Sequence, residues 1–148
     1  METKNKLNPR VKLIVNDYVE LAKLADGVHL GQDDISVLEA RKILGENKVI
    51  GLSTHNLEQI KNAPQKILNY LALGPVFESR TKSGHEKVLG LDILSKASKL
   101  ASIPLVAIGG INTKNVADVY ATGIKSVAVI SDIFEAEDTK SQIQKYFK

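Results

Sequence analysis

The sequence predicts a parallel α/β domain of about six strands that alternate with helices. Short apolar runs rich in β-branched residues recur along the chain and are typical of buried strands; they lie at residues 11–15, 28–30, 49–52, 70–73, 105–108 and 127–130. Between them, apolar residues spaced by three or four positions indicate helices with one buried face. Because short loops join these units, we expect a parallel sheet with right-handed crossovers.

The helices are predicted from their apolar stripes and their capping residues. The stripes are Leu21/Leu24/Ala25, Val37/Ala40/Leu44, Leu94/Ala97/Ala101, Val116/Val119/Tyr120 and, in a last helix, Ile143/Tyr146/Phe147. Ser36 and Glu39 form a capping-box pattern, and the other expected caps are Asn56, Asp92 and Asp138 at helix starts and Gly45 and Gly123 at helix ends. This pattern fits either an open doubly wound sheet or a (β/α) barrel, which would be incomplete because eight units need at least about 200 residues.

Composition restricts the class of protein. The 148 residues fit a single domain, 1–148, with 43% hydrophobic and 25% charged residues and no cysteine. The absence of cysteine excludes disulfides and thiolate chemistry and indicates a cytoplasmic protein. No apolar run is long enough for a membrane span, and no secretory signal is apparent. A net charge of +3 without a basic block is compatible with phosphorylated substrates and argues against nucleic acid.

Polar and glycine-rich residues follow the ends of most predicted strands, where parallel α/β folds bind ligands. Asp17 and the pair Asp33/Asp34 follow successive strands and could hold Mg²⁺. Helix capping explains these acids equally well. Gly109 and Gly110, with Ser131 after the next strand, suit a phosphate group, although a tight turn alone would also require the glycines.

The loop between residues 74 and 90 is long for this repeat and carries Ser79, Thr81 and Lys82. Two hydroxyls and a cation fit an oxyanion such as diphosphate, while the alternative is an ordinary exposed loop. His55, beside Ser53, could act as an acid or base or could be a hydrogen-bonding spacer. His29 lies within a predicted strand and is expected to be structural.

Several motifs in order resemble one family. The segments VNDYVELAKLADGVHLGQDD, GLSTH, LGPVFESRTKSG, GLDIL, IPLVAIGGI and SVAVISDIF are similar to the thiamine phosphate synthase family, which includes thiamine-phosphate pyrophosphorylases and has thiazole tautomerase relatives. The resemblance implies an incomplete TIM-type barrel that lacks the first two strand-helix units. It also implies the family's transferase reaction, which joins hydroxymethylpyrimidine diphosphate to thiazole phosphate and releases diphosphate.

The resemblance assigns roles to individual residues. Mg²⁺ would be held by Asp17 and Asp34, and Ser53 and Lys82 would act in catalysis. The substrate-binding set would be Asn16, Ser53, Ser79, Thr81, Lys82, Ile108, Gly110, Ile130 and Ser131. In the family mechanism, Mg²⁺ and cations stabilise the departing diphosphate, and the thiazole nitrogen attacks the resulting carbocation.

The sequence also departs from the family pattern. A Gln-x-Arg-x-Lys-like cluster that binds the pyrimidine diphosphate has no counterpart here, and Glu78 and Ser79 replace the usual proline and threonine. Two alternatives therefore stay open: a non-catalytic binder of thiazole phosphate or thiamine phosphate, and a tautomerase that uses His55. An incomplete barrel would expose two sheet edges, so we expect a homo-oligomer or swapped assembly that covers them.

Overall fold

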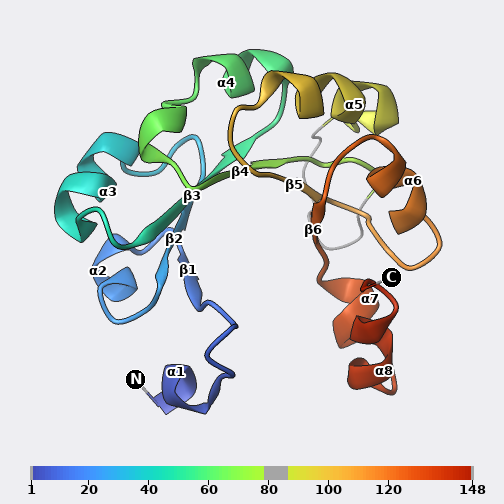
Figure 1. The fold of residues 1–148 in the computed structure, drawn as a ribbon, viewed down its shortest axis with the longest axis horizontal. Helices are drawn as coiled ribbons and strands as arrows, with labels where there is room; N and C mark the ends of the chain where they lie inside the picture. The colour runs from blue at the N-terminus through green and yellow to red at the C-terminus, as the bar shows by residue number, and fades with distance from the viewer. Residues whose placement is uncertain (1, 79–86, 148) are drawn as a thin grey trace.

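The computed structural model describes residues 2–78 and 87–147 and contains a six-stranded parallel sheet. The strands pair in chain order, and they are β1 (Ile14–Asn16), β2 (Gly27–Leu30), β3 (Val49–Thr54), β4 (Tyr70–Leu73), β5 (Leu105–Ile108) and β6 (Ser126–Ala128). The sheet curls into an open arc (Figure 1). Because the strand order never reverses, the fold is an incomplete (β/α) barrel and not a doubly wound sheet.

Helices cover the outer, convex side of this arc (Figure 1). They are α2 (Val19–Ala22), α3 (Val37–Leu44), α4 (Leu57–Asn62), the 3₁₀ turn η1 (Gln65–Ile67), α5 (Gly90–Leu100) and α6 (Val116–Ala121). Three further helices, α1 (Glu2–Lys6), α7 (Ser131–Phe134) and α8 (Thr139–Gln144), lie at the two ends of the arc. The buried core lies between the sheet and the outer helices, so the concave face is left for other contacts.

Most of the expected helix caps are confirmed. Ser36 and Glu39 form a complete capping box on α3, and the side chains of Asn56 and Asp138 accept hydrogen bonds from the third backbone N–H of their helices. The expected cap at Asp92 is wrong, since α5 begins two residues earlier at Gly90 and its N-cap residue is Leu89. Asp92 lies instead in the first turn, where its charge favours the helix dipole.

The apolar stripes are correct in the middle of the chain and only partly correct at its ends, where Ala25 and Tyr146 are buried as expected. The side chains of Leu21 and Leu24 are 56% and 51% exposed, because α2 is a single turn that buries Val19 and Ala22 instead. In the last helical segment only Tyr146 is buried, whereas Ile143 and Phe147 are 38% and 82% exposed. Helices at the ends of the arc have a neighbouring unit on only one side, so apolar residues facing the open side stay exposed.

The two edge strands are also displaced from their predicted positions. β1 begins at Ile14 rather than Val11, and β6 ends at Ala128 rather than Ile130. Each edge strand pairs with one neighbour only, so fewer hydrogen bonds hold its ends in extended form. Val11 and Ile130 are accordingly 51% and 56% exposed, and Ile130 becomes the N-cap residue of α7.

Arg41 links two loops at the amino-terminal end of the sheet. Its buried guanidinium donates hydrogen bonds to the carbonyl oxygens of Ile67, Gly45 and Lys48 and to the side-chain oxygen of Asn69. Asn69 in turn accepts a hydrogen bond from the backbone N–H of Ile50 in β3. A planar group with five donors can satisfy several converging carbonyls at once, so Arg41 fixes the loops that precede β3 and β4.

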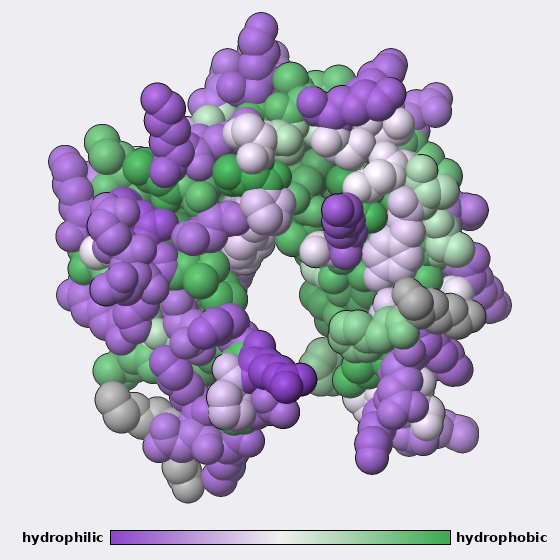
Figure 2. All heavy atoms as spheres, in the orientation of Figure 1, coloured by the Kyte–Doolittle hydropathy of each residue, from purple (hydrophilic) through white to green (hydrophobic). Residues whose placement is uncertain are grey.

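An opening runs through the molecule between the two ends of the arc. The space-filling view shows it bordered by α1 on one side and by the α7/α8 region on the other (Figure 2). The residues of this C-terminal end include two largely exposed phenylalanines, Phe134 and Phe147. Within the part of the chain described, no helix has the length and apolar character needed to cross a membrane.

Asp132 joins the C-terminal segment to the loop that follows β5. Its Oδ2 accepts hydrogen bonds from the Tyr146 hydroxyl, from Nε2 of Gln142 at 2.7 Å and from the backbone N–H of Thr113 at 3.4 Å. Burial raises the pKa of the Asp132 carboxyl, but these hydrogen bonds outweigh that effect, and the pKa lies below its ordinary value of 3.8. The carboxylate therefore stabilises the folded C-terminal segment.

We predict that Asp132→Asn lowers the free energy of unfolding at pH 6 and that this loss shrinks as the pH falls. Because the folded pKa of Asp132 lies below its unfolded value, the stabilisation is present above pH 3.8 and is lost as the pH falls through the folded pKa. Urea denaturation between pH 3 and pH 6 measures the effect. Asp118→Asn, an exposed change on α6, is the control. A loss that stays constant with pH would contradict the prediction.

Candidate functional site

A pocket of about 420 Å³ lies at the carboxyl ends of four consecutive strands, β3 to β6. Because parallel strands all deliver their carboxyl ends to one rim, segments far apart in sequence meet here. The lining residues are Ser53, Thr54, His55, Ala72, Gly74, Pro75, Phe77, Glu78, Val88, Ile108, Gly109, Gly110, Ile111, Ala128, Val129, Ile130 and Ser131. The pocket thus contains eight residues singled out from the sequence: Ser53, His55, Glu78, Ile108, Gly109, Gly110, Ile130 and Ser131.

Gly109 and Gly110 line the pocket directly after β5. Both have positive φ, 98° and 64°. A Cβ on Gly109 would lie 2.6 Å from the Cα of Pro75, and one on Gly110 would lie 2.3 Å from the carbonyl oxygen of Glu78. The glycines are therefore needed so that the loop after β4 can pack against the loop after β5. This steric need accounts for both glycines without a ligand.

The loop after Gly110 is held by asparagines. The carbonyl oxygen of Gly110 accepts hydrogen bonds from Nδ2 of Asn115 at 3.0 Å and from Nδ2 of Asn112 at 3.3 Å. The backbone N–H of Asn112 donates to Oδ1 of Asn115 at 2.8 Å. Among the hydrogen bonds found for the described residues, the backbone N–H of Gly110 donates to none. This loop therefore places a main-chain donor beside the pocket in a fixed conformation.

Ser53 and His55 stand on the β3 side of the pocket. The Oγ of Ser53 is 2.8 Å from Nε2 of His29, and the Ser53 carbonyl oxygen accepts a hydrogen bond from the side-chain amide of Gln32. The Nδ1 of His55 lies 2.9 Å from the carbonyl oxygen of Gly74, which can only accept, so Nδ1 of His55 carries the proton. Thr54, between them, is buried and donates to the carbonyl oxygen of Ala72.

Asn16, Asp17 and Asp34 lie at the same rim but outside the pocket, at the ends of the adjacent strands β1 and β2. All three are exposed. The Oδ2 of Asp34 accepts a hydrogen bond from the backbone N–H of Gly31 at 2.7 Å, and Asp17 has a positive φ of 63°. Asp tolerates this conformation better than most residues, and such backbone outliers are concentrated at functional sites.

These acids fit a hard divalent cation. Two carboxylates at neighbouring strand ends are the number that Mg²⁺ usually takes from a protein, with water and phosphate oxygens as its other ligands. No cluster of three or more His, Cys, Asp or Glu side chains suited to a metal is present among residues 2–78 and 87–147. A site made by the protein alone, such as a zinc site, is therefore not formed by the described residues.

The sequence-based predictions and the described structure do not cover the same residues of the site. Ser79, Thr81 and Lys82 lie outside the described residues. Conversely, three contacts were not expected from the sequence. Gln32 and His29 each form a hydrogen bond with Ser53, and Tyr70 forms one with His29. They depend on which residues face each other across β2, β3 and β4, and no pattern in the sequence fixes that register.

Comparison with known proteins identifies relatives of this chain and agrees with its fold. The family model for thiamine monophosphate synthase matches residues 4–133. Proteins named thiamine-phosphate synthase from Caldicellulosiruptor saccharolyticus and Prochlorococcus marinus are 44% and 46% identical over 135 and 127 residues, which is 90% and 84% of this chain. The chain spans 61% and 36% of the lengths of these two relatives.

Solved structures also resemble this chain in fold. Thiamine phosphate pyrophosphorylase from Pyrococcus furiosus superposes with a TM-score of 0.82 at 38% identity, over 90% of this chain and 64% of that one. A 3-hexulose-6-phosphate synthase superposes with a TM-score of 0.64 at 16% identity, a likeness that extends to the fold alone. With the family model matching most of its length and relatives above 40% identity, this chain belongs to the thiamine monophosphate synthase family.

Proposed function

We propose that this chain, acting as one domain, carries a thiamine phosphate synthase site. One part of the site would bind thiazole phosphate, and another part would bind the metal. The reaction would join hydroxymethylpyrimidine diphosphate to thiazole phosphate and release diphosphate. The observation that carries this proposal is that one pocket brings Ser53, Gly110, Ile130 and Ser131 together, while the two acids follow the adjacent strands β1 and β2 at the same rim of the sheet. Family membership supports the same assignment.

The phosphate of the thiazole substrate would bind between the loops after β5 and β6. The Gly110 backbone N–H and the Ser131 hydroxyl, both at the pocket, would donate hydrogen bonds to its oxygens. Ile108 and Ile130 provide apolar surface for the ring. Fixed donors of this kind need no rearrangement as charge develops, which is the usual source of electrostatic stabilisation in such sites.

The pyrimidine diphosphate would lie toward β1, β2 and β3. Asn16 and Ser53 would contact it, and Lys82, with Ser79 and Thr81, would neutralise the diphosphate from the loop that follows β4. Asp17 and Asp34 would hold Mg²⁺, which when bound would neutralise charge on the diphosphate leaving group. These substrates are highly charged and cross membranes poorly, so we place the reaction in the cytoplasm.

We predict that Asp34→Asn lowers kcat/KM for diphosphate release by about tenfold or more, because a neutral amide binds Mg²⁺ less well than a carboxylate. Asparagine can still accept the hydrogen bond from Gly31, so the fold should be retained. Asp33→Asn is the matched control, since Asp33 is adjacent and also exposed. Activity is measured as diphosphate released from the two substrates at varied Mg²⁺.

Equal effects of Asp33→Asn and Asp34→Asn would contradict the metal assignment. If the wild-type chain releases no diphosphate even at high enzyme concentration, the synthase proposal fails. Calorimetry with thiamine phosphate then shows whether the chain is a non-catalytic binder. If the chain instead isomerises the thiazole carboxylate ring, and His55→Ala abolishes that turnover while Asp34→Asn does not, the chain is a tautomerase.

Glu78 is the one acidic residue among the described residues that line the pocket. A carboxylate beside a bound phosphate repels it. We predict that Glu78→Gln tightens binding of thiamine phosphate by about threefold at low salt, and that the gain shrinks at high salt because exposed charges are screened. Calorimetry at two salt concentrations measures this. Glu46→Gln, in the exposed loop before β3, is the control, and unchanged affinity of Glu78→Gln at both concentrations would contradict the prediction.

We also propose that another polypeptide segment, in a second copy or a swapped assembly, covers the open edges of the arc. Each of β1 and β6 pairs on one side only, whereas parallel sheets are normally covered throughout. Exposed apolar side chains lie near both edges, including Val11 near β1 and Ile130 and Phe134 after β6. Groups of exposed apolar residues at an unpaired edge favour association.

We predict a mass in solution of at least twice the 16.1 kDa of the chain, measured by size-exclusion chromatography with light scattering. Phe134→Ser, which changes an 80% exposed residue at one edge, should shift the equilibrium toward monomer. Leu38→Ser, which changes a 55% exposed residue on the outer helix α3, should not. A wild-type chain that is monomeric at every concentration would contradict the proposal.

A further inference from the structure

Three residues on neighbouring strands form one row across the sheet. His29 in β2 pairs with Gly51 in β3, and Gly51 pairs with Tyr70 in β4. Gly51 has no side chain, and a Cβ built on it would lie 2.0 Å from the Tyr70 ring. The Tyr70 ring therefore crosses over β3 at this point and stacks on the His29 ring, with centroids 5.6 Å apart and planes at 18°.

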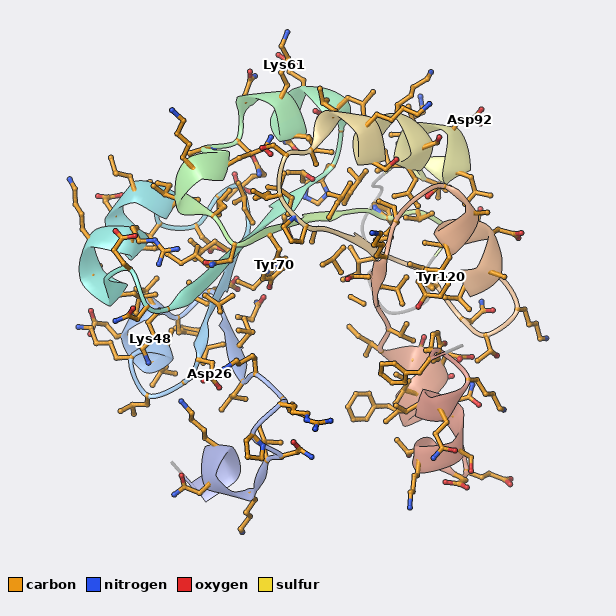
Figure 3. The ribbon with its side chains drawn as sticks, viewed as in Figure 1. Asp26, Lys48, Lys61, Tyr70, Asp92 and Tyr120 are labelled. Carbon is orange, nitrogen blue, oxygen red and sulfur yellow. The ribbon has the colours of Figure 1, made fainter. Side chains whose placement is uncertain are left out.

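Tyr70 lies on the concave side of the arc, away from the outer helices (Figure 3). Ser53 is two residues beyond Gly51 in β3, so it faces the same side one step closer to the carboxyl rim. Ser53 lines the pocket, while Tyr70 and His29 are not among its lining residues. The row is thus positioned directly behind the part of the pocket wall that Ser53 forms.

Hydrogen bonds connect this row to Ser53. The Tyr70 hydroxyl is 2.9 Å from Nδ1 of His29, and Nε2 of His29 is 2.8 Å from Oγ of Ser53. The backbone of Ser53 is held as well, because its carbonyl oxygen accepts from Gln32. Ser53 is therefore fixed at both its side chain and its main chain before any ligand binds.

The direction of donation follows from the chemistry of the three groups. A neutral imidazole donates from one nitrogen and accepts at the other. A phenol donates readily and accepts weakly, and burial raises the pKa of Tyr70, so its hydroxyl keeps its proton. With His29 in its Nε2–H tautomer, Tyr70 donates to Nδ1 of His29, Nε2 of His29 donates to Ser53, and the Ser53 hydroxyl hydrogen is left to donate into the pocket.

We propose that His29 and Tyr70 are positioning residues that orient the Ser53 hydroxyl as a hydrogen-bond donor to the pyrimidine diphosphate substrate, with Gly51 making room for their contact. The inference rests on the proposed function for the identity of the ligand. The orientation of Ser53 itself does not depend on that identity. His29 thus has a role beyond packing within its strand.

Kinetics of Tyr70→Phe test the positioning role, because phenylalanine keeps the ring over Gly51 and removes only the hydroxyl. We expect kcat/KM for the pyrimidine diphosphate to fall by about 3- to 10-fold, the size of one hydrogen bond, with KM for thiazole phosphate unchanged. In a Ser53→Ala background, Tyr70→Phe should have no further effect. The control is Tyr120→Phe, which removes a hydroxyl bonded to the carbonyl oxygen of Tyr146 and should leave both constants unchanged.

A purely structural role gives a different result: Tyr70→Phe would alter the constants of both substrates, and its effect would persist in the Ser53→Ala background. Either outcome overturns the inference. A second measurement is independent of activity, since ¹⁵N chemical shifts of His29 report which ring nitrogen carries the proton. We expect the Nε2–H tautomer in the wild-type chain. The Nδ1–H tautomer would overturn the inference even in an active enzyme, and the Nε2–H tautomer in an inactive chain would count only against the proposed function.

Discussion

The pairing of six parallel strands in chain order is the constraint on which the fold and its pocket depend. It sends every strand's carboxyl end to one rim and every amino end to the other. At the amino-terminal rim, Arg41 donates hydrogen bonds to carbonyl oxygens of the loops before β3 and β4. With that rim held by hydrogen bonds, the opposite rim can carry glycines and exposed acids that contribute little to stability.

Glycines with no space for a side chain bring the strands and loops of the rim into close contact. A Cβ on Gly74 would lie 2.3 Å from the carbonyl oxygen of Ile108, just as one on Gly51 would strike Tyr70. At Gly109 and Gly110, the same lack of space joins the loop after β4 to the loop after β5. The pocket wall is therefore built from close backbone packing, which keeps main-chain donors fixed.

The sequence was sufficient for the fold wherever a residue's environment is set by its own helix or strand. The capping box at Ser36 and the buried stripe of Leu94 and Ala97 follow from local spacing. The sequence was not sufficient where a neighbouring helix or strand sets the environment of a residue. Leu21 is exposed because the single turn of α2 buries Val19 and Ala22 instead, and Asp92 lost its expected cap position because Gly90 begins the helix with a positive φ.

The candidate site likewise contains a part that the sequence predicts and a part that it does not. Strand-end position was enough to bring Ser53, Gly110 and Ser131 into one pocket, because parallel topology alone decides that. The support behind Ser53 could not be predicted, since the contact of Tyr70 with His29 requires the register of three strands and a glycine between them. The described part of the pocket also carries little charge, because Glu78 is the one formally charged side chain among its described residues. A phosphate bound by the described residues alone would rely on main-chain and hydroxyl donors, so the orientation of each hydroxyl would matter more than it would beside an arginine.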